Sequence, residues 1–170
     1  EAAVLQLALE QLRGAAQSAE GVLDLVRELA NHEPAAIEAR EQVVLAMDAL
    51  ARHVNLSGAL SLLDVGSNRG SFARAILEAA PKLHLVAVEP DERFAASCGD
   101  LPRTELIRAR IEDVPLESER FDIVHSCHTI EHLADPMRAL NDHWRCLEPN
   151  GLLILDAPNL ALVGGDLQER

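Results

Sequence analysis

The chain has 170 residues, of which 48% are hydrophobic, and it carries a formal net charge of −13. A chain of this length buries roughly 70% of its unfolded surface, which suits one globular domain and leaves no room for a second full one. The acidic charge argues against nucleic acid and anionic membrane surfaces as partners, because both attract basic proteins. We therefore expect a small-molecule partner.

The cysteines Cys98, Cys127 and Cys146 are widely spaced and form no CxxC pair. This pattern indicates neither a disulfide framework nor a zinc site, so we expect no metal site and a reducing, cytoplasmic location. No signal peptide and no apolar run of the ~20 residues that span a membrane is visible. Because the chain begins with Glu1 rather than Met, a targeting segment is only weakly excluded.

Residues 1–56 are rich in Ala, Leu, Glu and Gln and show no strand-like alternation. Apolar residues recur there at helical spacing, and Pro34 suits the first turn of a third helix that runs to about His53. We expect an N-terminal extension of two or three amphipathic helices. They either pack on the sheet, or form a dimer, or act as a lid over a substrate.

From Leu60 onward, strand-like and helix-like patterns alternate, which is typical of a parallel sheet covered on both faces. The predicted strands are residues 60–65, 83–88, 104–108, 121–126 and 151–156. The predicted helices are 70–80, 91–99 and 135–147, with Asp91 as a helix cap and Trp144 packed against the sheet. Asn150 and Gly151 are expected to turn the chain into the last strand. The predicted fold is α/β, a doubly wound, mostly parallel sheet in residues 57–170.

Polar residues follow four of the five predicted strands, where ligands bind in such sheets. These segments are 64–70, 89–91, 110–113 and 126–132. In the first, Gly66 and Gly70 permit a sharp turn and leave backbone amides bare for a ligand. In the second, Glu89 lies 25 residues after Asp64, where a carboxylate can accept both hydroxyl hydrogens of a ribose. The convergence indicates a nucleoside site, and the preceding glycine turn favours this role for Glu89 over the alternative of a solvated acid at a strand end.

The first turn distinguishes between nucleotide ligands. A dinucleotide site needs GxGxxG, but three residues separate Gly66 from Gly70, so the pattern is not satisfied. No GxxxxGK[ST] sequence is present, which disfavours a nucleoside triphosphatase. The expected ligand carries a nucleoside without a phosphate chain.

Six segments in order resemble the motifs of class I S-adenosylmethionine-dependent methyltransferases, particularly the small-molecule type 11 and type 12 branch. They are residues 63–70, 86–90, 111–116, 121–126, 130–136 and 147–153, and the resemblance covers about residues 60–160. It implies a Rossmann-like fold and in-line methyl transfer from S-adenosylmethionine to a small-molecule acceptor, with S-adenosylhomocysteine as product. The alternative is a non-catalytic cofactor-binding or scaffolding domain of a larger protein. A dehydrogenase is disfavoured by the glycine spacing.

The resemblance also implies residue roles. Asp64 and the glycine turn would meet the methionine part of the cofactor, Glu89 the ribose, and Ile111 with Glu112 the adenine. The full cofactor-binding set would be Asp64, Gly66, Ser67, Asn68, Gly70, Glu89, Pro90, Ile111, Glu112, Ser126, Cys127 and His128. A base for the acceptor's proton would come from His128, Glu131 or His132, and the two histidines are the predicted catalytic residues because histidine titrates near neutral pH.

Two residues depart from the family pattern. Asn68 stands where a middle glycine is usual, and asparagine tolerates left-handed backbone better than most residues, so we expect the turn to survive. Arg110 stands two residues before Glu112, where an acid is often found, and an arginine cannot accept a hydrogen bond from the adenine amino group.

The familiar methyltransferase sheet has two further strands, and residues 159–170 are too few for them. Residues 152–155 are therefore expected to form an edge strand, which a neighbouring element must cover. A removed C-terminal segment is the leading expectation, with a homodimer or the N-terminal helices as alternatives.

Overall fold

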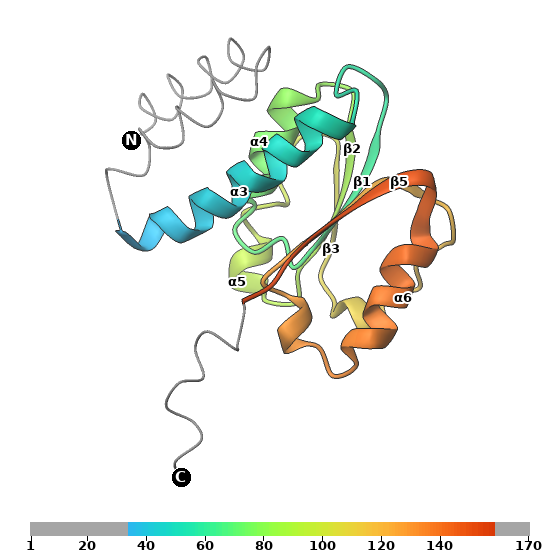
Figure 1. Ribbon diagram of the computed structural model, residues 1–170. Coiled ribbons are helices and arrows are strands. Elements are labelled where there is room, and N and C mark those ends of the chain that lie inside the picture. The colour runs from blue at the N-terminus through green and yellow to red at the C-terminus, as the bar shows by residue number, and fades with distance from the viewer. Residues whose placement is uncertain (1–33, 159–170) are drawn as a thin grey trace.

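The computed structural model describes residues 34–158 of the chain (Figure 1). The helices predicted before Pro34 and the segment 159–170 lie outside these described residues. The predicted third helix is confirmed, because α3 runs from Pro34 to His53. Pro34 occupies its first turn, where the missing amide hydrogen of proline costs no hydrogen bond.

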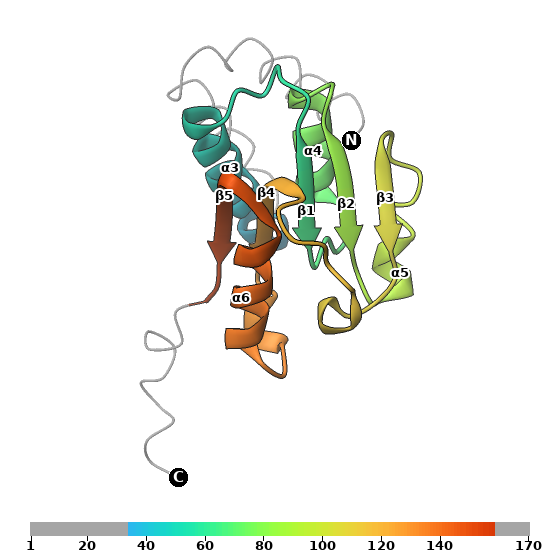
Figure 2. The same ribbon diagram turned by 90° about the vertical axis from the view of Figure 1, so that its right-hand side faces the viewer.

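The five predicted strands are all present and lie parallel in one sheet of order β3-β2-β1-β4-β5 (Figure 2). They are β1 (Ser61–Val65), β2 (His84–Val88), β3 (Thr104–Ile107), β4 (Phe121–Cys127) and β5 (Leu147–Asp156). The order reverses between β1 and β4, which opens a crevice for a ligand beyond their carboxyl ends. The doubly wound, Rossmann-like prediction is confirmed.

Short helices connect the strands. They are α4 (Ser71–Ala79), α5 (Glu92–Ala95), α6 (Pro136–Cys146) and the 3₁₀ turns η1 (Ile111–Asp113) and η2 (Ile130–His132). Asp91 caps α5 as predicted, since its carboxylate accepts a hydrogen bond from the amide of Arg93. The predicted extent of this helix was too long, because after Ala95 the chain continues as turns that place Cys98 beneath the loop after β1.

Side chains alternate between the two faces of the sheet and form two apolar cores. Leu62, Leu85 and Ile123 pack with α3 and α4 on one face. The next residues along β1 and β4, Leu63 and Val124, pack on the other face with the end of α6. Figures 1 and 2 show α3 and α4 on one side of the sheet and α6 on the other. Successive strand residues point to opposite faces, so apolar runs of this kind need a cover on both sides.

Two details differ from the predictions. β5 begins at Leu147 rather than at residue 151, because Leu147 already pairs with Phe121 before the register shifts. Trp144 does not pack against the sheet, since its side chain is 73% exposed on α6. The buried face of α6 carries the smaller Ala139 and the polar His143 instead, so hydrophobicity alone misplaced the face.

The predicted edge strand is confirmed, because β5 lies at one end of the sheet order with Leu155 41% exposed. Leu152 and Ile154 pack against the core that α3 shares, so this helix shields part of one face of β5. What lies beyond the open edge stays a prediction. None of the described helices combines the length and apolar character needed to cross a membrane.

His143 is a buried histidine whose two ring nitrogens have no hydrogen-bond partner among the described residues. Burial lowers its pKa, because the apolar surroundings disfavour the imidazolium. As the pH falls through the ordinary histidine pKa of ~6.5, the unfolded chain therefore takes up a proton before the folded one does. We expect the free energy of unfolding to fall over this range.

The variant His143→Leu removes the group whose protonation makes stability depend on pH. It also removes two buried ring nitrogens that have no hydrogen-bond partner among the described residues. We expect it to be as stable as the parent or more stable by ~1–2 kcal/mol, with a flatter pH dependence. Urea unfolding at about pH 7.5 and about pH 5.5, on either side of the ordinary histidine pKa, measures both effects. The exposed His84→Asn is the matched control. An unchanged pH dependence in His143→Leu would contradict the assignment.

Candidate functional site

A cleft of about 860 Å³ opens at the carboxyl ends of the strands, between α3 and the loops that follow β1, β2, β3 and β4. Ten of the twelve predicted cofactor-binding residues line it: Asp64, Gly66, Ser67, Asn68, Glu89, Pro90, Ile111, Glu112, Cys127 and His128. The predicted catalytic His132 lines it too. The parallel strands bring these side chains together because their carboxyl ends meet at one edge of the sheet (Figure 2).

Two predicted residues, Gly70 and Ser126, do not line the cleft. Ser126 is fully buried, and its hydroxyl has no hydrogen-bond partner among the described residues. It belongs to β4, where its neighbours His125 and Cys127 do line the cleft, so the strand's alternation turns Ser126 away. Gly70 serves the turn, as the residue that precedes α4.

The turn after β1 uses three left-handed residues, Gly66 (φ 73°), Asn68 (φ 49°) and Gly70 (φ 73°). The expectation for Asn68 is confirmed, because asparagine holds the left-handed conformation at the position where the family pattern has glycine. The turn is tied to the neighbouring strand, since the amides of Gly66 and Ser67 both donate to the carbonyl of Val88, at 2.9 and 3.1 Å. These bonds fix the loop against the end of β2.

Gly66 has a second reason to be glycine. A Cβ at this position would lie 2.1 Å from Oγ1 of Thr129, far inside van der Waals contact. The Thr129 hydroxyl lies within hydrogen-bonding distance of the carbonyl oxygens of Val65 (3.1 Å) and Cys127 (3.0 Å), so it bridges the ends of β1 and β4. The bare backbone at Gly66 therefore lets the two loops close on each other as well as leaving room for a ligand.

The carboxylate of Glu89 is held in place by two backbone amides. Oε2 accepts from the amide of Asn68 at 2.8 Å and Oε1 from the amide of Asp91 at 2.9 Å. The side chain is only 6% exposed and lines the cleft. Each carboxylate oxygen retains a second lone pair, so Glu89 can still accept hydrogen bonds from a pair of ligand hydroxyls.

Asp64 forms a buried pair with His125, whose Nδ1 lies 2.7 Å from Oδ1 of Asp64. Asp64 is 1% exposed and His125 5% exposed, and the imidazole stacks on Phe72 with ring centroids 3.7 Å apart. The other carboxylate oxygen, Oδ2, is buried without a partner among the described residues, although Asp64 lines the cleft. An unpaired buried carboxylate oxygen is costly, so it marks a place where a ligand can donate a hydrogen bond.

Arg110 and Glu112 neutralise each other at the far side of the cleft. The Arg110 guanidinium lies 3.0 and 3.2 Å from the two oxygens of Glu112, and the amide of Ala134 donates to the same carboxylate. Arg110 and this amide lower the pKa of Glu112 to about 2. The Glu112 carboxylate already has its hydrogen-bond partners. Backbone groups and the apolar side chain of Ile111 are therefore left to contact the nucleobase of a ligand here.

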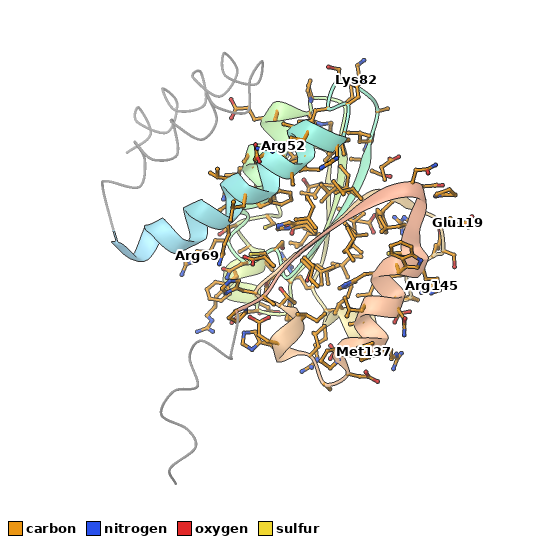
Figure 3. All side chains as sticks on the ribbon, viewed as in Figure 1. Arg52, Arg69, Lys82, Glu119, Met137 and Arg145 are labelled. Atoms are coloured by element: carbon orange, nitrogen blue, oxygen red, sulfur yellow. The ribbon has the colours of Figure 1, made fainter. Side chains whose placement is uncertain are left out.

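Arg69 extends this side of the cleft. Its guanidinium lies 5.0 Å from the centre of the Phe94 ring, within cation–π range, and both residues line the cleft. Figure 3 places Arg69 at the carboxyl-end side of the sheet and Lys82 at the opposite end, near the start of β2. Phe94 gives this part of the cleft an aromatic wall.

Cys127 ends β4 and His128 follows it, beside Asp156, the last residue of β5. The Cys127 thiol lies 3.6 Å from Oδ2 of Asp156, and Nε2 of His128 lies 3.6 Å from the same oxygen. Burial, reinforced by Asp156, raises the pKa of Cys127 to about 12, so the thiol keeps its proton. His128 has left-handed backbone (φ 47°), which its amide stabilises by donating to the Asp156 carbonyl at 2.9 Å. The side-chain amide of Gln42 on α3 contacts Nε2 of His128 at 2.5 Å.

Several residues that line the cleft were not among the predicted site residues, and Gln42, Phe72 and His125 are three of them. His125 could have been found, because β1 and β4 are neighbours and His125 is the register partner of Asp64. Gln42 could not, since nothing in the sequence places the middle of α3 over this edge of the sheet. Glu131, the third candidate base, does not line the cleft, and its buried Oε2 has no hydrogen-bond partner within the described part of the chain.

A family model described as "Methyltransferase domain" matches residues 63–155. An uncharacterised methyltransferase of Mycolicibacterium gilvum is 38% identical over 103 residues, which cover 56% of this chain and 38% of that protein. A protein of Mycobacterium tuberculosis named "Probable S-adenosylmethionine-dependent methyltransferase" is 32% identical over 102 residues, or 59% of this chain and 36% of that protein. The chain thus spans less than half the length of these relatives.

The fold also matches solved structures. The structure of an S-adenosylmethionine-dependent methyltransferase from Mesorhizobium loti aligns with a TM-score of 0.54 and 22% identity, over 62% of this chain and 50% of that one. At this identity the likeness establishes the fold alone.

Proposed function

Because the chain belongs to the family of S-adenosylmethionine-dependent methyltransferase domains, we propose that it transfers a methyl group from this cofactor to a small-molecule acceptor by in-line displacement. The observation that carries the proposal is that two carboxylates line one cleft. Glu89 is held in place by two backbone amides, and Asp64 has a buried oxygen without a hydrogen-bond partner among the described residues. These two groups match the two polar ends of the cofactor, its ribose hydroxyls and its methionine ammonium.

The residues of the cleft fit the cofactor. Asp64 Oδ2 is the acceptor for the ammonium group, and the bare turn at Gly66 gives the methionine chain access to backbone. Glu89 holds the ribose hydroxyls, and Ile111 packs on the adenine beside the Arg110–Glu112 pair. The acid that is often found at the position of Arg110 is absent, so adenine contacts come from backbone and apolar groups.

The cofactor's sulfonium supplies a methyl group that is already activated for displacement. What this chain must do is align the acceptor with that group and exclude competing water. His128 and His132 both line the end of the cleft and are the side chains that can accept a proton when the acceptor must lose one. The free cysteines among the described residues agree with a reducing, cytoplasmic location, which stays a prediction.

Turnover tests the proposal. The chain is incubated with S-adenosylmethionine and a library of hydroxyl-, amine- and carboxylate-bearing small molecules, and formation of S-adenosylhomocysteine is measured with each. We expect acceptor-dependent product from at least one class. Tight cofactor binding without turnover on any acceptor would contradict catalysis and favour a binding or scaffolding domain.

The variant Asp64→Asn tests the ammonium contact. Asparagine keeps an oxygen for His125 but removes the charge, and a hydrogen bond to a charged group contributes ~1.5–3 kcal/mol, so we expect affinity for S-adenosylmethionine to fall roughly 10- to 150-fold. Calorimetric titration measures this, with the exposed Asp100→Asn as matched control. Affinity equal to that of the parent, in a folded variant, would remove Asp64 from the site.

A further inference from the structure

Three side chains with metal-binding chemistry meet at the carboxyl ends of β4 and β5. They are Cys127, His128 and Asp156, and one ligand atom from each lies within 4.8 Å of the other two. We propose that they bind a single divalent ion of borderline softness, such as Zn²⁺, with an open coordination position toward the cleft. The sequence offers no ligand-pair motif for such a site, because Asp156 lies 28 residues beyond His128.

The sheet itself brings the ligands together. Cys127 and Asp156 are register partners on neighbouring parallel strands, so their side chains lie on the same face. His128 follows directly and is bound to the same residue, since its amide donates to the Asp156 carbonyl at 2.9 Å. The arrangement is therefore built into the backbone pairing and does not depend on a chance meeting of surface side chains.

The distances suit one ion. Ligand atoms about 2.0–2.3 Å from a tetrahedral Zn²⁺ lie roughly 3.3–3.6 Å from one another. The Cys127 Sγ and His128 Nε2 atoms each lie 3.6 Å from Oδ2 of Asp156. A shared ion thus needs only small adjustments of the three side chains.

Nε2 of His128 faces a polar partner that a metal ion can replace. The Gln42 side-chain amide contacts Nε2, and a neutral ring that accepts a hydrogen bond there carries its lone pair on Nε2. A metal ion takes this lone pair, and the long Gln42 side chain turns aside. The side chains of His128 and Asp156 are 36% and 46% exposed, so an ion can reach them.

The ligand set indicates the kind of ion and its role. The metal ion displaces the proton of the Cys127 thiol, which passes to solvent, because a coordinating thiol is deprotonated. The resulting thiolate, an imidazole and a carboxylate together favour Zn²⁺ over Mg²⁺ or Ca²⁺, which prefer oxygen ligands only. Three protein ligands leave a fourth position, as in catalytic zinc sites. Cys127 and His128 line the cleft, so that position is available to an acceptor's oxygen, whose pKa the ion would lower. This role of the ion rests on the proposed function. Because His128 then binds the metal, His132 is the side chain that accepts the proton of the methyl acceptor.

Cobalt titration tests the site without the cofactor. Co²⁺ is added to the reduced, metal-free chain, and absorption is recorded. We expect one equivalent to bind with a thiolate-to-cobalt charge-transfer band and the intense visible bands of tetrahedral Co²⁺, and Zn²⁺ to displace it. Cys127→Ser should lose the charge-transfer band. His128→Asn and Asp156→Asn should weaken Co²⁺ binding by more than the ~10–100-fold typical of losing an outer-shell partner.

Two control variants and a folding check complete the design. Cys146→Ala removes a buried thiol on α6, and His84→Asn removes an exposed histidine, and both should bind Co²⁺ as the parent does. Circular dichroism establishes that each variant is folded. The proposal would be overturned if the parent chain showed no thiolate-to-cobalt charge-transfer band. It would also be overturned if Cys127→Ser kept the same band as the parent. Binding of S-adenosylmethionine in the presence of a chelator is measured separately, so loss of the metal site and loss of the cofactor site are distinguishable.

Discussion

Replacing Glu89 by alanine is expected to weaken binding of S-adenosylmethionine roughly a hundredfold or more, because two hydrogen bonds to a charged group, each ~1.5–3 kcal/mol, are lost. The carboxylate also organises the site, since it anchors the amides of Asn68 and Asp91. Without it, the loops after β1 and β2 lose their common acceptor. Calorimetric titration with S-adenosylmethionine and S-adenosylhomocysteine measures the effect.

Two further variants separate the contact with the ribose from the anchoring of the loops. Glu89→Gln keeps one oxygen for an amide and should weaken binding less than Glu89→Ala does. Glu105→Ala removes an exposed acid of β3, which forms an ion pair with Arg120 outside the cleft, and should leave affinity unchanged. If Glu89→Ala binds the cofactor as tightly as Glu105→Ala, Glu89 is not the ribose acid.

Replacing Gly66 by alanine is expected to abolish measurable cofactor binding and to destabilise the fold. The new Cβ would lie 2.1 Å from Oγ1 of Thr129, and a non-glycine residue at φ 73° adds a further cost of ~1–2 kcal/mol. The clash pushes the loop after β4 away from the loop after β1, so the cleft loses the shape that holds the methionine end. Urea unfolding and calorimetric titration measure the two consequences.

A second substitution distinguishes the clash from the backbone strain. Thr129→Ala removes the clashing hydroxyl, so the double variant Gly66→Ala, Thr129→Ala should recover part of the stability but not the share due to the left-handed φ. Gly99→Ala is the matched control, because its Cβ would meet only the Leu106 side chain at 3.6 Å and a carbonyl at 3.8 Å. Equal stability of Gly66→Ala and Gly99→Ala would refute the steric argument.

Much of the fold was predictable because its signals are local. The apolar runs that form β1 and β2 are followed by the segment 64–70 and by Glu89. Because the carboxyl ends of parallel strands lie at one edge of the sheet, these two segments are expected to lie together whatever the details of packing. Asn68 was predictable for the same reason, since its left-handed conformation depends on its own side chain.

The rest depended on contacts between segments distant in the sequence. His125 became part of the site only through its register with Asp64, and Gln42 only through the packing of α3 over the sheet. Trp144 was misplaced because burial on α6 follows the helix's position relative to β4 and β5, which puts His143 inside and the larger tryptophan outside. The meeting of Cys127 with Asp156 likewise follows from strand pairing and has no sequence signature.

The central claim is that the cleft beyond β1, β2 and β4 is a site for S-adenosylmethionine. Calorimetric titration of the chain with S-adenosylmethionine, S-adenosylhomocysteine and NAD tests it most directly. We predict that one equivalent of S-adenosylmethionine binds, that S-adenosylhomocysteine competes for the same site, and that NAD does not bind. Binding of NAD with no binding of the other two ligands to the folded chain would contradict the account.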